Sequence, residues 1–175
     1  SKTSTARTYL AFAELLRGDE KGKAGVIPLL EKAVSAQPTT IALRAALVQE
    51  HLRVGNSDSA LSVAQSGAAA NNAPPDASAL LASTYERLGK AELAAETYRK
   101  LVPSNPQRSD WKLKLAELEA GSGRTTQATT LLRSLITDRP FDSTPYIALA
   151  KLIARDNPRE AISIARELGE REPHK

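Results

Sequence analysis

A repeat with a period of 34 residues constrains the fold of this chain more than any other feature of its sequence. Gly55, Gly89 and Gly123 stand 34 positions apart. An alanine five places after each glycine and a proline near the end of the unit recur in the same register, at Ala60, Ala94 and Ala128 and at Pro38, Pro106 and Pro140. A fixed period of this length is typical of a chain built from one supersecondary unit that stacks on copies of itself.

The repeated residues predict a pair of helices in each unit. The stretch LLASTYERLGKAELAAETYRKLVPSNP, residues 80–106, contains two short amphipathic segments separated at Gly89 and ended by Pro106. Glycine can end the first helix because it takes a left-handed conformation without a steric penalty. Alanine suits the point where two helices cross closely. Val and Ile do not alternate with polar residues over the length of a strand, so the sequence predicts an all-α fold.

Five repeats account for nearly the whole chain, and we expect them to form a single solenoid over residues 1–175. Their ranges are 7–40, 41–74, 75–108, 109–142 and 143–175. The first repeat departs from the pattern, with Gly22 one place late and Val26 where the small alanine is expected. Asn72 stands where the second repeat would have its proline. The last repeat is one residue short in the turn between its helices, which brings Ala161 one place early.

The pattern resembles the tetratricopeptide repeat, a helix-turn-helix unit. The third repeat carries the resemblance best, through Leu81, Ala82, Tyr85, Gly89, Ala94, Tyr98 and Pro106. The resemblance implies a right-handed superhelical solenoid whose first helices line a concave face that binds a protein or peptide. A helical bundle would need longer helices and no fixed period. RNA-reading helical repeats usually run one residue longer and lack this combination of Gly, Ala and Pro.

The concave face implied by the resemblance has a floor of small and apolar residues. The candidate partner-binding residues are Ala45, Gln49, Leu52, Arg53, Ala79, Ser83, Glu86, Arg87, Leu113, Glu117, Ile147, Lys151 and Arg155. Such a floor suits an amphipathic helix or an extended segment with small apolar anchors, and it equally allows close helix packing. Chaperone-binding members grip a C-terminal carboxylate with Lys, Arg and Asn, a cluster that these positions lack.

Three of these candidates, Arg53, Arg87 and Arg155, share the thirteenth place of their repeats. Two interpretations stay open. The arginines can form a basic rim for an acidic peptide or an anionic polymer. Alternatively, each cation offsets the dipole at the end of a first helix, an effect of ~0.3–1 kcal/mol.

The sequence offers little support for an enzyme, a metal site or a nucleic-acid site. It has no Cys, and neither His51 nor His174 has a second ligand at helical spacing. The segment Gly121–Thr126 resembles part of a phosphate-binding loop, but it follows a helix and has Arg124 in place of the lysine. The net charge of +4 is spread among acidic residues. We expect no catalysis, no cofactor and no nucleic acid.

A second resemblance concerns the cellular system. The Ala-, Leu- and Arg-rich style of LRAALVQEHLRVGNSDSALSVAQSG and EAISIARELGEREP is similar to the long bacterial repeat proteins of exopolysaccharide synthesis and export, especially that of the exosortase (PEP-CTERM) system. It implies a non-catalytic scaffold of an envelope assembly, periplasmic or outer-membrane-associated. The alternative is a cytoplasmic peptide-sensing or adaptor module that regulates an attached effector domain.

Two features concern the chain's extent and its relation to a membrane. The chain has no Met, even at position 1, and we expect it to be an excerpt of a longer protein. No apolar run reaches membrane-spanning length, so we expect no insertion of this segment into a membrane.

Overall fold

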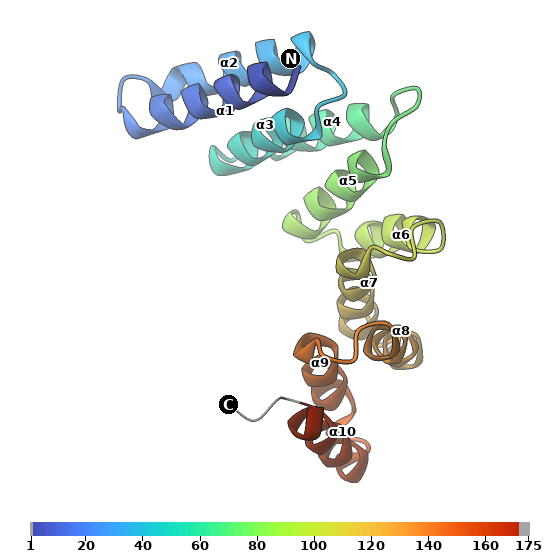
Figure 1. Ribbon diagram of the computed structural model, residues 1–175. Coiled ribbons are helices and arrows are strands. Elements are labelled where there is room, and N and C mark those ends of the chain that lie inside the picture. Colours follow the sequence, from blue (N-terminus) through green and yellow to red (C-terminus); the bar gives the residue numbers. More distant parts are fainter. Residues whose placement is uncertain (1, 172–175) are drawn as a thin grey trace. The chain divides into compact units, whose positions relative to one another are not determined.

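The computed structural model describes residues 2–171, and this part of the chain folds into α-helices without a strand (Figure 1). The helices are α1 (Lys2–Gly18), η1 (Lys23–Gly25, a 3-10 helix), α2 (Val26–Ala36), α3 (Ile41–Arg53), α4 (Ser57–Ala68), α5 (Pro75–Arg87), α6 (Ala91–Leu101), α7 (Ser109–Gly121), α8 (Thr125–Asp138), α9 (Ser143–Ile153) and α10 (Pro158–Arg171). The predicted all-α fold of paired helices is confirmed. Within this range, no helix is long and apolar enough to cross a membrane.

The helix starts follow the period of the sequence. The first helices α3, α5, α7 and α9 begin at residues 41, 75, 109 and 143, at intervals of 34 residues. The second helices α4, α6 and α8 begin at residues 57, 91 and 125, whereas α10 begins at residue 158, one residue early. The shortened turn of the last repeat therefore moves its second helix without changing the start of its first.

The conserved spacing of the glycines has its cause in the turns between paired helices. Gly55, Gly89 and Gly123 have φ values of 80°, 70° and 76°, in the left-handed region. The amide after each glycine donates a hydrogen bond to the carbonyl five residues earlier, at 2.8 Å from Asn56, 2.9 Å from Lys90 and 2.9 Å from Arg124. This is the Schellman arrangement that satisfies the free carbonyls of a helix end. The predicted role of these glycines is confirmed.

The first repeat turns differently. Gly22 allows the chain to pass close to α1, because a Cβ at this position would lie 2.8 Å from the Leu16 carbonyl oxygen. The short helix η1 then occupies the place where the second helix of the other repeats begins, and α2 starts at Val26. Val26 has no exposed surface, so it fills the interior where the other repeats have alanine.

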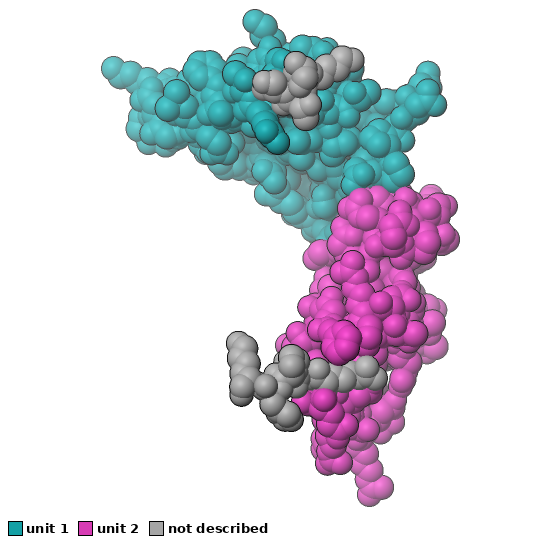
Figure 2. All heavy atoms as spheres, in the orientation of Figure 1, with its two compact units in different colours: residues 1–97 teal, residues 98–175 magenta. Residues whose placement is uncertain are grey.

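The chain divides into two compact units, residues 1–97 and residues 98–175, with the boundary inside α6 (Figure 2). The expectation of a single solenoid stays a prediction. In the first compact unit, core clusters form around Leu30, Leu43 and Val48. In the second, Tyr146 and Leu149 are among the buried residues of the cluster shared by α7, α8, α9 and α10. Close crossing explains the repeated alanine, since Ala60, Ala94 and Ala128 are each 0% exposed.

Buried polar side chains at the fourth place of three repeats join neighbouring elements. Arg44 donates to the carbonyl oxygens of Pro38 at 3.1 Å and Val63 at 3.0 Å, and to the hydroxyl of Ser66 at 3.1 Å. Tyr146 donates to the Pro140 carbonyl at 3.2 Å. In the repeat between them, Lys112 binds Asp138 at 2.7 Å and Ser134 at 3.2 Å. The chemistry differs, but each side chain satisfies groups near the end of a second helix.

Candidate protein-binding groove

A hollow of about 340 Å³ opens between α7 and α9 in the second compact unit. Its lining residues are Ala116, Glu117, Ala120, Leu132, Ala148, Lys151 and Leu152. Three of the seven are alanines, and their small side chains leave the space that larger residues would fill. Leu132 of α8 is 3% exposed and belongs to the core of this compact unit. The hollow therefore has an apolar floor that is supported by rigid packing.

Two charged side chains of opposite sign stand at this hollow. Glu117 is exposed and accepts an ion pair from Lys114, with 3.1 Å between Nζ and Oε2. Lys151 is also exposed, but it forms no hydrogen bond or ion pair with any residue that the structure describes. The negative charge of Glu117 is thus balanced within the chain, and the positive charge of Lys151 is available to a partner.

A second hollow of about 190 Å³ lies at the other end of the same pair of helices. Its lining residues are Ser109, Asp110, Leu113, Leu135, Arg139, Asp142 and Pro145. On α7, the seven residues from Asp110 to Glu117 correspond to a rise of ~10 Å. We name the two hollows together the α7/α9 groove. The hollow with the three alanines is the apolar hollow, and the other is the polar hollow.

The acidic residues of the polar hollow are already bound within the chain. Arg108 pairs with Asp110 at 2.9 Å, and the hydrogen bond from this guanidinium holds the pKa of the Asp110 carboxyl below its ordinary value. Asp142 caps α9 by accepting a hydrogen bond from the Thr144 amide at 3.0 Å. Arg108 also lies 3.7 Å from the ring centroid of Trp111, which is itself buried, as its place near the start of a helix suggested.

The structure distributes the predicted partner-binding residues unevenly. Gln49, Arg53, Arg87, Glu117, Ile147, Lys151 and Arg155 are exposed, Ala45, Leu52, Ser83, Glu86 and Leu113 are half-buried, and Ala79 is buried. The α7/α9 groove brings together Leu113, Glu117 and Lys151 from this set. Ile147 is 45% exposed on α9, and neither it nor Arg155 lines a hollow of the groove. Ala79, at 9% exposed, has little surface to offer a partner.

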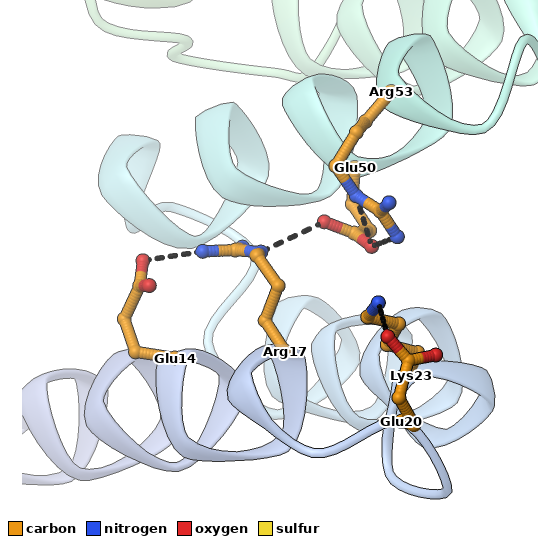
Figure 3. A network of polar contacts seen from close by, with 6 residues as sticks. All are labelled: Glu14, Arg17, Glu20, Lys23, Glu50 and Arg53. Carbon is orange, nitrogen blue, oxygen red and sulfur yellow. Dashed lines mark hydrogen bonds and ion pairs between the residues drawn. The ribbon is translucent and has the colours of Figure 1, made fainter.

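Arg53 has a partner that the sequence did not suggest. Glu50 is 2% exposed and accepts hydrogen bonds from Arg53 at 2.5 Å and 3.0 Å and from Arg17 at 3.2 Å (Figure 3). Arg17 also pairs with Glu14 at 2.5 Å, so α1 and α3 are joined by a network of alternating charge. The hydrogen bond from Arg53 holds the pKa of Glu50 below its ordinary value. The charge of Arg53 therefore serves a buried carboxylate, which is neither of the two roles considered for it.

A second buried glutamate has the same surroundings in the other compact unit. Glu119 is 2% exposed and accepts hydrogen bonds from Arg99, at 2.6 Å, and from Arg124. Burial raises the pKa of the Glu119 carboxyl, but the two guanidiniums outweigh burial and the net pKa is lowered. Glu119 occupies the place at which other repeats have Arg17, His51 or a hydrophobic residue. That departure was the one signal in the sequence that could have indicated a special role.

Comparison with known proteins identifies the family. The tetratricopeptide repeat model matches residues 45–109 and 80–143, which together span more than half of the chain. None of the curated proteins compared matches it in sequence. A crystal structure of MamA superposes with a TM-score of 0.71 and 15% identity, over 99% of this chain and 98% of that one. YrrB, described as a TPR protein with an unusual peptide-binding site, superposes with a TM-score of 0.68 and 14% identity, over 94% and 85%. The family match and these shared folds agree with the helix pairs and glycine turns described above, and the chain belongs to the tetratricopeptide repeat family.

Proposed function

We propose that this chain is a non-catalytic interaction module that binds a segment of another protein in the α7/α9 groove. The observation that carries the proposal is the apolar hollow, which is lined by three alanines and two leucines and flanked by Glu117 and Lys151. An apolar hollow with a small number of polar groups at its edge is the usual form of a recognition site. The similarity in fold to YrrB, which is described as having a peptide-binding site, supports this proposal.

The titratable groups also support a binding role over catalysis. A general acid at neutral pH needs a pKa raised towards 7, which enzymes obtain by burial without a compensating cation. Glu50 and Glu119 are buried, yet each is held by two guanidiniums and has a lowered pKa. Their arrangement stabilises contacts between helices and leaves both carboxylates ionised.

We further propose that the partner belongs to a bacterial envelope assembly for exopolysaccharide synthesis or export, and that the module acts in the periplasm or at the outer membrane. The support for this setting is the resemblance of residues 43–67 and 160–173 to the repeat proteins of those systems. The fold and the groove support a protein partner but carry no information on the compartment.

Site-specific photocrosslinking in the native organism tests both proposals. A photoreactive amino acid replaces Glu117 or Ile147 at the groove, or the exposed Ser163 of α10 as the matched control. We expect the same partner from both groove positions and not from the control, and we expect Ala148→Phe, which fills the apolar hollow, to abolish the product. Equal crosslinking with the hollow filled would refute the groove assignment.

The identity of the crosslinked protein decides the cellular setting. Proteins of the envelope polysaccharide machinery would support the scaffold proposal. Crosslinking only to cytoplasmic proteins would overturn the envelope proposal and favour the regulatory alternative, while leaving the groove assignment intact.

A further inference from the structure

We infer that the segment bound in the α7/α9 groove is acidic, with a bulky apolar side chain that enters the apolar hollow and acidic side chains that meet Lys151 and Arg139. This inference rests on the proposed function and names the chemistry of the partner. The groove contains four acidic or basic side chains that line its two hollows besides Asp110, and their internal pairing decides which sign of charge a ligand must supply.

The size of the apolar hollow determines the anchor. At about 340 Å³ it lies at the lower end of the range of roughly 300–1,000 Å³ that ligand sites occupy. Ala116, Ala120 and Ala148 expose only methyl groups to this space, so no hydrogen bond rewards a polar side chain there. One Leu, Ile, Met or Phe side chain fits these surroundings, and burying it is favourable because its apolar surface leaves water.

The acidic side chains along the groove are bound within the chain, whereas two basic ones are not. Lys114 balances Glu117, Arg108 balances Asp110, and Asp142 is occupied as the cap of α9. Lys151 at the apolar hollow and Arg139 at the polar hollow have no hydrogen bond from the side chain and no ion pair within residues 2–171.

The remaining charges near the end of α9 do not reverse this balance. Arg155, one turn beyond Lys151, also has no ion pair among the described residues, and the neighbouring Asp156 offsets one of these two cations. Excess positive charge therefore remains at both hollows. Opposite charge in the partner would place the segment in register and speed its association.

The spacing of the two hollows limits the form of the segment. Their α7 residues are separated by ~10 Å along the helix axis. An extended segment advances ~3.3 Å per residue, so side chains about three residues apart reach the two hollows. The inferred ligand thus has one acidic residue adjacent to its apolar anchor, facing Lys151, and another about three residues away, facing Arg139.

Peptide selection followed by charge reversal tests the inference. A phage-displayed library of random peptides is selected on the whole chain, and enriched peptides are synthesised for fluorescence-polarisation binding. We expect sequences in which a large apolar residue lies close to Asp or Glu. Lys151→Glu and Arg139→Glu should each weaken binding by about fivefold or more, since each replaces an attraction by a repulsion. Lys90→Glu, an exposed lysine in the turn before α6, makes the same change in net charge and is the matched control.

Reciprocal exchange provides the decisive comparison. A peptide whose acidic residue next to the anchor is replaced by Lys should bind Lys151→Glu better than the original chain. Ala148→Phe should abolish binding of every selected peptide, and Ala120→Phe serves the same purpose if the first variant fails to fold, as judged by circular dichroism.

The outcomes separate this inference from the proposed function. Peptides that Ala148→Phe blocks but that contain no acidic residue, or that bind Lys151→Glu unchanged, would overturn the inferred chemistry and leave the groove as a binding site. Failure to enrich any peptide, or binding that persists with the hollow filled, would overturn both.

Discussion

Replacing Gly67 by Ala near the end of α4 should destabilise the protein, although the same change in most helices is stabilising. Alanine in a helix is favoured over glycine by about 0.5–1 kcal/mol. At Gly67, however, the added Cβ would lie 2.4 Å from Cδ and 2.7 Å from Nε of Arg44. Ordinary contacts between such atoms are ~3.5–4.0 Å. The buried Arg44 side chain must therefore move by about 1 Å.

The cost follows from what Arg44 does in its present position. Its guanidinium is largely buried and donates three hydrogen bonds, to Pro38, Val63 and Ser66, at 3.0–3.1 Å. A shift of about 1 Å lengthens these bonds beyond their useful range. Hydrogen bonds to a charged group contribute roughly 1.5–3 kcal/mol each. Losing one or two of them outweighs the gain in helix propensity, and we expect a net loss of ~1–3 kcal/mol in the free energy of unfolding.

A double-mutant cycle with urea denaturation measures this coupling. In the Arg44→Ala background there is no Cδ or guanidinium to displace, so Gly67→Ala should become stabilising by about 0.5–1 kcal/mol. The sign of the effect thus depends on Arg44. If Gly67→Ala stabilised the chain equally in both backgrounds, the proposed contact between this glycine and Arg44 would be refuted.

Three further perturbations test other features. Gly89→Ala meets no atom within 4 Å but must keep a φ of about 70°, so it should lower the free energy of unfolding by ~1–2 kcal/mol in thermal denaturation, and an unchanged stability would contradict the left-handed turn. Tyr146→Phe should cost ~1 kcal/mol by removing the bond to Pro140, and a neutral result would show that this carbonyl finds another partner. The pKa values of Glu50 and Glu119 are lowered in the folded state, so the unfolded chain binds protons first as the pH falls. Stability should be fully present above the ordinary pKa of 4.5 and should decline below it, as measured by the urea midpoint, and the double variant with Gln at both positions should show a smaller decline.

Local and repeated features of the fold were accessible from the sequence. The period of 34 residues located the helix pairs, and the glycines located turns that the backbone can make only with φ in the left-handed region. The missing residue in the last repeat predicted the early start of α10. These features depend on residues near one another in the chain and recur in several repeats, so each instance reinforces the others.

Features that depend on encounters between different helices were decided by the tertiary structure. The sequence placed Arg53 at the end of a helix, but not beside a buried Glu50 that it shares with Arg17 of another repeat. It placed Glu117 and Lys151 on one predicted lining, but not that Lys114 occupies the first and no described residue occupies the second. Exposure, ion pairing and hollows arise from distances between side chains far apart in the chain. The repeat pattern specifies where the helices begin and end, while the particular side chains that meet between them decide which charges remain for a partner.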